Sequence, residues 1–364
     1  MKVKHELVLK LEHLSKAWHG FALRDVSLDV ADGEYFALLG PNGAGKTLLL
    51  ETIIGFHKPD KGRILLDSKD VTSLPPEKRS LGYVPQNCML FPHMRVWQNV
   101  EFGLRMRGVA EGDRRKTVDR MLMLMGLTSL AEKSPMTLSG GERQKVALAR
   151  VLVIEPKVVL LDEPLTSIDD ESSRVVKDEL KRIHRDLNVT VVHVTHNQME
   201  AFSLAQRVAV MNCGQVVQVG TTKSLLSCPA DEFVGRFLGY ENICKGRLVK
   251  SEEGLSFVDV SGLVIRAAGD VEDDECTVGI RPEDVSLHTK PFTSSEANVL
   301  RGVVADCVDL GPIVSVSVDT GFKVKATVAK GSFLELNLER GTEVWLSFKF
   351  ESVRILNKHQ PQVG

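Results

Sequence analysis

The sequence predicts an α/β domain built on a parallel sheet, followed by an all-β domain. Three observations predict it. An apolar strand at Tyr35–Leu39 runs into a glycine-rich loop, apolar strands then alternate with helical stretches, and short β-like runs fill the chain beyond about residue 242. Strands alternating with helices indicate a parallel sheet. Short strands between glycine and charged turns, as in GLVIRAAGD and VSVSVDTG, indicate small β-barrels.

The length of the chain, 364 residues, supports more than one hydrophobic core. We place the first domain at residues 1–240, with a methionine-rich helical subdomain at about 87–135. The all-β domain then covers residues 241–364, and its second barrel covers about 298–357.

Composition indicates a globular protein, with 43% hydrophobic and 26% charged residues. A formal net charge of −2 gives no support for a nucleic-acid partner. The six cysteines are scattered without metal-ligand spacing, which favours reduced thiols in the cytosol. No apolar run approaches the roughly 18 residues of a membrane span, and the chain starts without the apolar stretch of a signal peptide. If this protein serves a membrane, another chain must cross it.

The elements follow in order along the first domain. Residues 5–39 alternate apolar and polar side chains in HELVLKLEHL and LRDVSLDV, which predicts short strands. The sequence LLLETIIG after the glycine-rich loop predicts a helix. Later apolar strands are expected at Val158–Leu161, Val189–Thr195 and Arg207–Met211.

The glycine-rich loop at Gly40–Thr47 matches the phosphate-binding pattern G-x-x-x-x-G-K-[ST] between a strand and a helix. Its backbone N–H groups and the helix N-terminus can hold phosphates. Lys46 is expected to reach the β- and γ-phosphates, and the Thr47 hydroxyl to ligate Mg²⁺. The nucleotide-binding residues expected here are Gly40, Pro41, Asn42, Gly43, Ala44, Gly45, Lys46, Thr47 and Leu48. The loop alone fits GTPases, kinases and many ATPases.

An apolar strand at Val158–Leu161 ends in two acids. Asp162 fits a carboxylate that holds Mg²⁺, and Glu163 fits one that polarises an attacking water. A buried strand with a charged end is the ordinary alternative. No N-K-x-D motif is present, so GTP is disfavoured.

The stretch Leu138–Glu142, followed by Arg-Gln-Lys, resembles the signature motif of ABC ATPases. Gln86 in YVPQN precedes it, and the acidic pair and His196 in VTHNQMEA follow it in the order of that family. The resemblance covers roughly residues 8–238. It implies a P-loop ATPase of ABC type, with a mixed sheet, an antiparallel β subdomain and a helical subdomain.

The resemblance also implies individual roles. Trp18 would stack on adenine, unless it is an ordinary core tryptophan. Gln86 would sense Mg²⁺ and the attacking water and link to the membrane subunit. His196 would contact the γ-phosphate, although a lone histidine after a strand is usually structural. Asp169 would communicate between two ATP sites, and the sequence departs slightly there, with Thr-Ser-Ile-Asp where Ser-x-Leu-Asp is usual.

The chain carries one phosphate loop and one signature. In the family these face each other across a dimer, which implies a homodimer with ATP and Mg²⁺ sandwiched between two copies. The signature residues that would complete the partner's site are Ser139, Gly140, Gly141 and Glu142.

Two segments resemble parts of the ATPase subunits of ABC importers. Leu90–Val100 resembles the segment that docks the coupling helix of a membrane subunit, with an amphipathic core stretch as the alternative. Gly279–Val285 resembles a phrase of the C-terminal regulatory barrels in importers of oxyanions, sugars, polyamines and iron. This implies an OB-like regulatory domain, transmembrane permease partners, a solute-binding protein, and a peripheral location at the cytoplasmic face of the cell membrane.

The tail resembles the small molybdate-binding barrels of molybdate and tungstate transport ATPases, in Lys325–Val328, Ser332 and Phe348–Val353. Hydroxyls and lysines suit a tetrahedral dianion. The expected oxyanion residues are Thr327, Lys330, Ser332 and Lys349. Phe350-Glu351 stands where Ala-Ser is usual, and a carboxylate facing the pocket would oppose anion binding. A barrel that only holds the dimer together is the alternative.

The leading hypothesis is therefore an import ATPase for molybdate or tungstate, with feedback inhibition by the oxyanion at the C-terminal domain. The main alternative is an import ATPase of the same kind whose solute is iron, a polyamine or sulfate. A soluble ABC ATPase acting on nucleic acid or ribosomes would carry two cassettes or a basic arm, and neither is visible. A further alternative is a protein that serves mainly as an anion sensor. The complete set of ATPase motifs argues against it, because a sensor would not need them.

Overall fold

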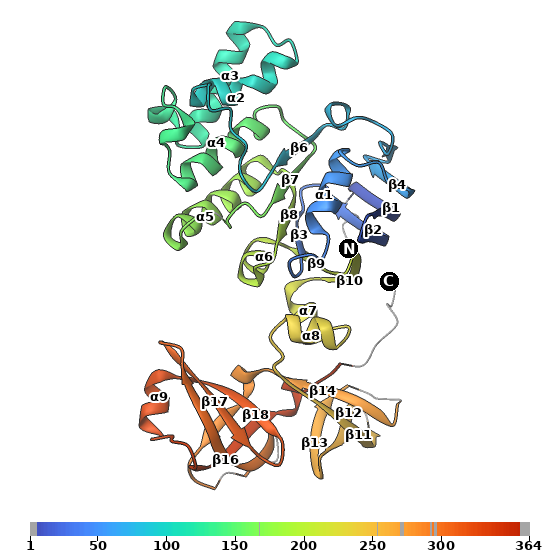
Figure 1. Ribbon diagram of the computed structural model, residues 1–364, viewed down its shortest axis with the longest axis vertical. Coiled ribbons are helices and arrows are strands. Elements are labelled where there is room, and N and C mark those ends of the chain that lie inside the picture. The colour runs from blue at the N-terminus through green and yellow to red at the C-terminus, as the bar shows by residue number, and fades with distance from the viewer. Residues whose placement is uncertain are drawn as a thin grey trace. The chain divides into compact units, whose positions relative to one another are not determined.

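The computed structural model divides into two compact units, Met1–Thr222 and Lys223–Gly364 (Figure 1). The described residues are 6–166, 168–252, 254–269, 273–291, 293–294 and 297–356. Ser167 of the expected inter-site loop and residue 357, the expected end of the second barrel, lie outside them.

The division between the units falls before residue 240, where the change of sequence texture predicts a boundary. Helix α8 (Glu232–Phe237) packs with the C-terminal unit, since a side chain at Gly235 would lie 2.9 Å from Leu356. Tyr240 also donates a hydrogen bond of 2.7 Å to the carbonyl of Leu226 at the end of α7 (Thr222–Ser227). The boundary between the two functional domains at residues 240 and 241 stays a prediction.

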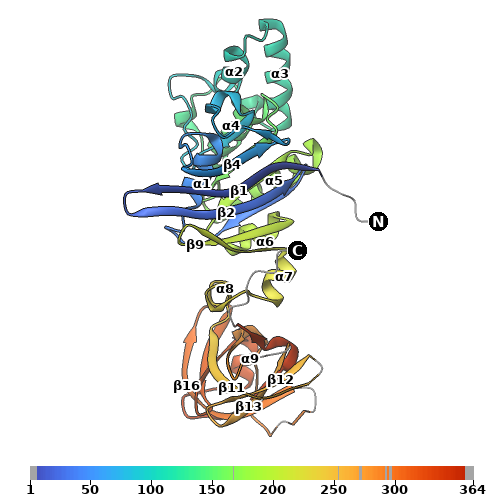
Figure 2. The ribbon, with the colours of Figure 1, turned by 90° about the vertical axis from the view of Figure 1, so that its right-hand side faces the viewer.

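Unit 1 begins with an antiparallel sheet in the order β2-β1-β4-β5. Its first two strands form a long hairpin (Figure 2). Leu9, Leu11, Val26 and Ile64 point inward from the sheet and are almost fully buried, as the alternating pattern predicts. The strands are β1 (Leu7–Trp18), β2 (Phe21–Ala31), β4 (Lys61–Leu66) and β5 (Lys69–Asp70).

The central sheet of unit 1 has the order β10-β9-β3-β8-β7-β6. Its strands are β3 (Tyr35–Leu39), β6 (Leu81–Val84), β7 (Val158–Asp162), β8 (Thr190–Thr195), β9 (Arg207–Asn212) and β10 (Gln215–Gly220). All neighbours are parallel except β9 and β10. Every residue of β3, β7 and β8 is buried, as expected for central parallel strands. The carboxyl ends of the parallel strands share one edge, where ligands bind in open α/β sheets.

Helices cover this sheet, and α2 packs on both α3 and α4 in the helical part of unit 1. Their shared core includes Val100, Leu104, Val118 and Leu122. Within the described part of the chain, no helix is both long and apolar enough to cross a membrane. The helices of unit 1 are α1 (Lys46–Ile54), α2 (Val96–Met106), α3 (Glu111–Leu124), α4 (Gly140–Leu152), α5 (Asp170–Leu187) and α6 (Gln198–Leu204), with short 3₁₀ turns at Pro76–Lys78, Thr128–Leu130 and Pro135–Thr137.

Unit 2 combines a closed barrel, in the order β11-β12-β13-β20-β14, with a five-stranded sheet in the order β15-β19-β16-β17-β18. One core joins them, with Val258 and Val278 from the barrel beside Val316 and Leu346 from the sheet. The barrel strands are β11 (Asn242–Glu252), β12 (Leu255–Val260), β13 (Leu263–Ala268), β14 (Glu275–Ile280) and β20 (Arg354–Ile355). The sheet strands are β15 (Ser286–His288), β16 (Ala297–Asp309), β17 (Ile313–Asp319), β18 (Lys323–Ala329) and β19 (Glu343–Lys349), joined by α9 (Lys330–Glu335) and 3₁₀ turns at Pro282–Asp284 and Phe350–Ser352.

Candidate nucleotide site

The phosphate loop lies between the buried strand β3 and helix α1. Its lysine is 5% exposed and folds back over the loop, so that Nζ of Lys46 donates hydrogen bonds of 2.9 Å and 3.0 Å to the carbonyls of Gly40 and Pro41. Burial lowers the pKa of Lys46, while the nearby carboxylates of Glu163 and Asp162 act in the opposite direction. The loop therefore presents a positive charge at the carboxyl edge of the sheet.

Two glycines of the loop are required by their surroundings. Gly45 has a φ of 98°, and a Cβ there would lie 2.4 Å from Cζ of Phe21. At Gly40, a Cβ would lie 2.3 Å from the carbonyl oxygen of Met211 on β9. Neither position can carry a side chain without moving its neighbours. The close packing explains how the loop backbone keeps a shape in which its N–H groups can surround an anion.

Asp162 ends β7 and is 3% exposed. Burial raises the pKa of its carboxyl, while hydrogen bonds from Thr47 and Tyr83 oppose the shift. Oγ1 of Thr47 donates to Oδ1 of Asp162 at 3.0 Å, and Oη of Tyr83 donates to Oδ2 at 3.3 Å. A hydroxyl and a carboxylate that already face each other are the oxygen donors that Mg²⁺ prefers. These residues therefore fit the expected metal.

Glu163 follows in a left-handed backbone conformation with a φ of 45°, which is uncommon outside glycine and often marks functional sites. Its backbone N–H donates to the carbonyl of Val194 at 2.9 Å. Its carboxylate oxygens lie 3.2 Å from Nδ1 of His196, 3.0 Å from Oγ1 of Thr166 and 3.5 Å from Nε2 of Gln86. Oε1 is also 4.0 Å from Nζ of Lys46. The structure thus gathers the three expected catalytic residues around one carboxylate.

The signature motif forms the N-terminus of α4, where Ser139 is exposed and Gly141 is buried. Oγ of Ser139 accepts from the backbone N–H of Glu142 at 3.2 Å, and Glu142 accepts from the backbone N–H of Ser139 at 2.7 Å. This capping box lowers the pKa of Glu142. Gly140 and Gly141 stand in the first turn, where the helix dipole is positive. No hydrogen bond or ion pair in the described ranges joins this motif to the phosphate loop of the same chain.

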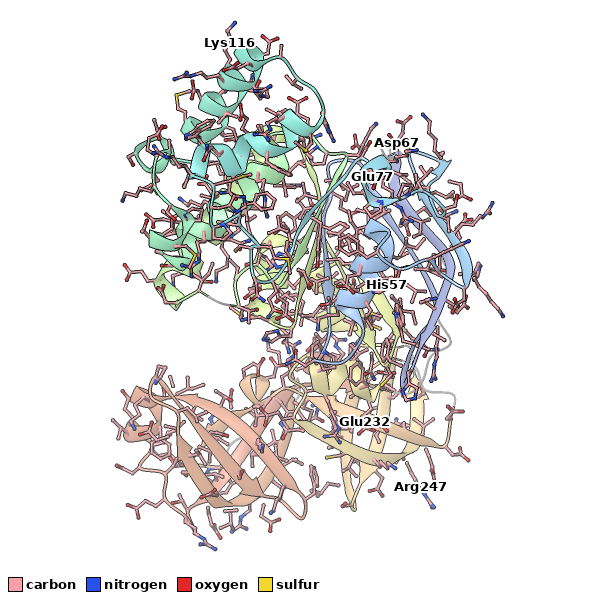
Figure 3. All side chains as sticks on the ribbon, turned by 45° about the horizontal axis from the view of Figure 1, so that its top comes forward. His57, Asp67, Glu77, Lys116, Glu232 and Arg247 are labelled. Atoms are coloured by element: carbon pink, nitrogen blue, oxygen red, sulfur yellow. The ribbon has the colours of Figure 1, made fainter. Side chains whose placement is uncertain are left out.

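Trp18 and Asp169 lie at element ends. Trp18 ends β1 and is half-buried, with its ring 5.3 Å from that of His57 (labelled in Figure 3) and 6.5 Å from that of Phe21. Because Phe21 touches the phosphate loop, the hairpin places Trp18 near it. Asp169 caps α5 by accepting from the N–H of Ser172 at 2.9 Å, which lowers the pKa of Asp169.

Sequence reasoning did not find the residues that tie the Gln86 segment to α4. Sγ of Cys88 donates to Oε1 of Gln144 at 2.9 Å. Arg150 donates to the carbonyls of Cys88 and Met89, both at 2.8 Å. The only signal was the place of Gln144 just after the signature; nothing in the pattern marks Arg150.

The expected docking segment leads into α2. Asn99 is fully buried and donates to the carbonyls of Phe91, Met94 and Arg95, at 3.1 to 3.2 Å. This fixes the loop before the helix, while Pro92 and His93 of the segment stay exposed. Part of the segment is therefore core, as the alternative reading expects, and part is available to a partner.

The four expected oxyanion residues do not form a cluster joined by hydrogen bonds. Thr327 of β18 pairs with Ser315, whose register reaches β16 at Val308. Lys349 of β19 pairs instead with Ala297, at the other end of β16. Ser332 and Glu351 are exposed in α9 and the turn after β19. Lys330 forms an ion pair with Asp309, so its charge is already partly compensated.

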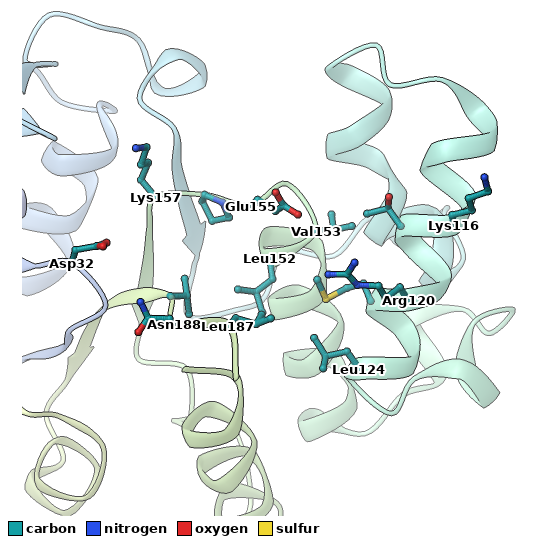
Figure 4. Close-up of a pocket in the computed structure, with 14 residues that line it drawn as sticks. Asp32, Lys116, Arg120, Leu124, Leu152, Val153, Glu155, Lys157, Leu187 and Asn188 are labelled. Atoms are coloured by element: carbon teal, nitrogen blue, oxygen red, sulfur yellow. The ribbon is translucent and has the colours of Figure 1, made fainter. Parts of the chain in front are cut away.

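A separate hollow of about 580 Å³ lies between α3 and the loops around Glu155 and Asn188 (Figure 4). Lys116 and Arg120 line its α3 side. None of the expected site residues lines it, so it is distinct from the site around Glu163.

Comparisons with known proteins show the family of the chain. A family model described as ABC transporter matches residues 23–166, and a TOBE domain model matches residues 278–356. The molybdate/tungstate import ATP-binding protein WtpC of Pyrococcus abyssi is 43% identical over 349 residues, which cover 96% of this chain and 100% of the relative. The sulfate/thiosulfate import ATP-binding protein CysA of Thermosynechococcus vestitus is 38% identical, covering 93% and 95%. Among solved structures, the dimeric ATP-binding cassette MJ0796 in a post-hydrolysis state with ADP and Pi matches with a TM-score of 0.53 and 28% identity, over 58% of this chain and 98% of that chain.

Proposed function

The chain belongs to the ATP-binding subunits of ABC importers, and we propose that the solute whose import it energises is molybdate or tungstate. Family membership makes it an ATP-hydrolysing transport subunit. The single observation that carries the site assignment is the convergence of Lys46, Gln86 and His196 on Glu163, beside Asp162, at the carboxyl edge of the central sheet.

Phosphate binding falls to the loop in this proposal. Lys46 and the backbone N–H groups of residues 40–48 hold the β- and γ-phosphates. Thr47 and Asp162, together with Gln86, would hold Mg²⁺, which would supply positive charge that screens the phosphates from repelling a nucleophile. Trp18 stacks on the adenine.

Glu163 is the general base. Its carboxylate accepts a proton from the attacking water, which needs an acceptor within hydrogen-bond reach of that water. His196 and Gln86 contact the same carboxylate from two other chain segments, so they hold it in place and meet the γ-phosphate and the water. Both therefore act beside the base rather than in place of it.

A second copy of the chain completes each site. The signature residues lie at the N-terminus of α4, whose positive dipole end suits phosphate oxygens. They are Ser139, Gly140, Gly141 and Glu142. In one chain this motif stays apart from the loop, which supports a homodimer with two composite sites, like the cassette dimer solved with ADP and Pi. Asp169, which caps α5, would communicate between the two sites.

The membrane partners are permease subunits, reached through the segment Leu90–Val100, with a solute-binding protein upstream. Pro92 and His93 of this segment are exposed, and the half-buried Met94 beside them suits a docking groove. We therefore propose that the protein works at the cytoplasmic face of the cell membrane as a peripheral subunit.

The substrate assignment rests on whole-chain similarity to a protein named for molybdate and tungstate import. Sulfate is the alternative that a specific observation favours, because CysA covers nearly as much of the chain at 38% identity. Iron and polyamines remain weaker alternatives. A non-transport ABC ATPase would not explain the TOBE domain.

We further propose that the oxyanion, bound at Thr327, Lys330, Ser332 or Lys349, slows ATP hydrolysis. An anion that binds best when the two ATPase domains are apart would shift the equilibrium from the closed to the open dimer. The coupling free energy between anion binding and dimer closure is expected to be about 1–3 kcal/mol. Because Lys330 is paired with Asp309, the anion has to compete with that carboxylate.

The test is ATP hydrolysis by the assembled complex, with each solute delivered by its binding protein. Molybdate or tungstate should stimulate hydrolysis, while sulfate, spermidine and ferric iron should not. A complex carrying Glu163→Gln is the matched control and should respond to none of them. Stimulation by sulfate, spermidine or iron alone would overturn the substrate assignment and leave the ATPase assignment intact.

A further inference from the structure

Behind the nucleotide site lies a buried polar chain that the mechanism above does not use. His193 on β8 is completely buried, and its Nδ1 lies 2.9 Å from Oη of Tyr35 on β3. Its other ring nitrogen, Nε2, faces Glu200 on α6, with 3.7 Å between Nε2 and Oε2. Helix α6 packs against both strands.

The contacts of these buried polar residues indicate which ring nitrogen of His193 carries the hydrogen. Burial lowers the pKa of His193 to about 3, so the ring is neutral. Burial also raises the pKa of Tyr35, so its hydroxyl keeps its proton and can donate a hydrogen bond to Nδ1. In that tautomer Nε2 carries the ring hydrogen and directs it toward the carboxyl of Glu200. Nε2 makes no hydrogen bond among the described residues, and a buried donor without a partner is unfavourable.

Glu200 in turn holds the backbone on both sides of His196. Oγ1 of Thr195 donates to Oε2 of Glu200 at 2.7 Å and accepts from the N–H of Asn197 at 3.0 Å. Oδ1 of Asn197 accepts from the N–H of Glu200 at 3.2 Å. His196 sits between two residues that are both tied to Glu200, and its own Nδ1 lies 3.2 Å from Oε1 of Glu163.

We propose that Glu200, supported by His193 and Tyr35, is a positioning residue that fixes His196 against Glu163. Glu200 is 7% exposed and acts through Thr195 and Asn197, not on the nucleotide itself. Small displacements of a catalytic group are costly to rate, so locking this turn preserves the alignment of the imidazole. The inference rests on the role proposed for His196.

The experiment measures kcat and ATP affinity of the full-length chain for Glu200→Ala and Glu200→Gln, each also combined with His196→Ala. Glu200→Ala should lower kcat about tenfold, since a misplaced group of this kind loses one to two orders of magnitude. ATP affinity should stay within about twofold of wild type, because the phosphate loop is untouched. Glu200→Gln should keep most activity, since its amide oxygen can still accept from Oγ1 of Thr195.

Two further variants complete the design. Tyr35→Phe frees Nδ1 of His193 and should lower kcat about threefold through loss of the preferred tautomer. Met199→Ala, on the exposed side of the same helix, is the matched control and should change neither kcat nor affinity.

In the His196→Ala background, Glu200→Ala should cause no further loss, because the group it positions is gone. The proposal would be overturned if Glu200→Ala lowered kcat by the same factor with and without His196. It would also be overturned if Glu200→Ala weakened ATP binding and left kcat unchanged. If Glu200→Ala does not fold, Tyr35→Phe alone and combined with His196→Ala carries the same cycle. A Tyr35→Phe loss that persists in full without His196 would also overturn the proposal. Wild-type turnover by His196→Ala alone would instead locate the failure in the role of His196.

Discussion

The two units of this protein present their candidate sites in opposite ways. In unit 1, Lys46, Gln86 and His196 come from distant parts of the chain and lie within 4.0 Å of the Glu163 carboxylate. In unit 2, the oxyanion candidates are spread over two strands of one sheet and helix α9, and the charge of Lys330 is already paired.

The difference follows from architecture. Parallel strands end at a common edge, so residues after β7 and β8, in the loop after β6 and at the start of α1 are brought together by topology alone. Antiparallel strands of a curved sheet distribute residues over both ends and faces. The assignment in unit 1 therefore stands on geometry, whereas that in unit 2 stands on sequence resemblance.

The largest expected effect is that of Glu163→Gln. The amide cannot accept the proton of the attacking water, so steady-state ATP hydrolysis should fall by at least about 100-fold. ATP binding and ATP-dependent dimers should persist, since the phosphate contacts remain. Hydrolysis and dimer formation are measured together, with the exposed Glu77→Gln (Glu77 is labelled in Figure 3) as control. Near wild-type turnover would contradict the role of Glu163.

Lys46→Ala should act on binding instead. Removing a buried cation from a phosphate site should cost about 2 kcal/mol or more of binding free energy. ATP affinity should therefore fall by at least about 30-fold. Calorimetric titration with ATP measures it, and the exposed Lys69→Ala provides the control. Unchanged affinity would mean that the loop lysine does not contact the nucleotide.

Arg79→Met should destabilise unit 1 without a catalytic role. Arg79 is 2% exposed, and it donates to the backbone carbonyls of Thr52, Ile53, Thr72 and Leu74. Leaving these buried acceptors unpaired should lower the free energy of unfolding of unit 1 by about 3 kcal/mol. Chemical denaturation should show the unit 1 transition shifted, while exposed Arg115→Met leaves it in place. An unshifted transition would mean that the carbonyls find other donors.

The smallest expected effect lies in unit 2. Asp309→Asn releases Lys330 and should strengthen molybdate binding by the full-length chain about threefold, since an exposed ion pair contributes less than about 1 kcal/mol. Thr327→Val should weaken it. Titration of both variants and wild type with molybdate and tungstate is the measurement. No binding at millimolar anion, with unaffected hydrolysis, would remove the feedback proposal and leave the ATPase untouched.

The sequence predicts much of unit 1 because its signals are local. The ABC-type fold with a C-terminal β domain is confirmed, and the strands expected at Tyr35–Leu39 and Val158–Leu161 are present. Each site motif follows directly from a strand or opens a helix. The methionine-rich stretch was less well predicted, because α2 begins only at Val96, where Asn99 ties the preceding loop.

What the sequence does not reveal depends on distant pairing. β20 closes the first barrel although it follows the whole second sheet, and two residues offer no periodic signal. The contacts of Gln144 and Arg150 with the Gln86 segment, and of Tyr35 with His193, join elements far apart in the chain. A lone histidine in an apolar strand reads as core until its partners are seen.

The most direct test of the central claim, that two copies share each ATP site, is a mixing experiment. Full-length Lys46→Ala and full-length Ser139→Phe are each expected to be inactive alone, since one lacks both loops and the other both signatures. Mixed in equal amounts, they should regain roughly a quarter of wild-type hydrolysis, because about half the dimers are mixed and each holds one complete site. Activity no higher than the sum of the two separate variants would contradict the shared site.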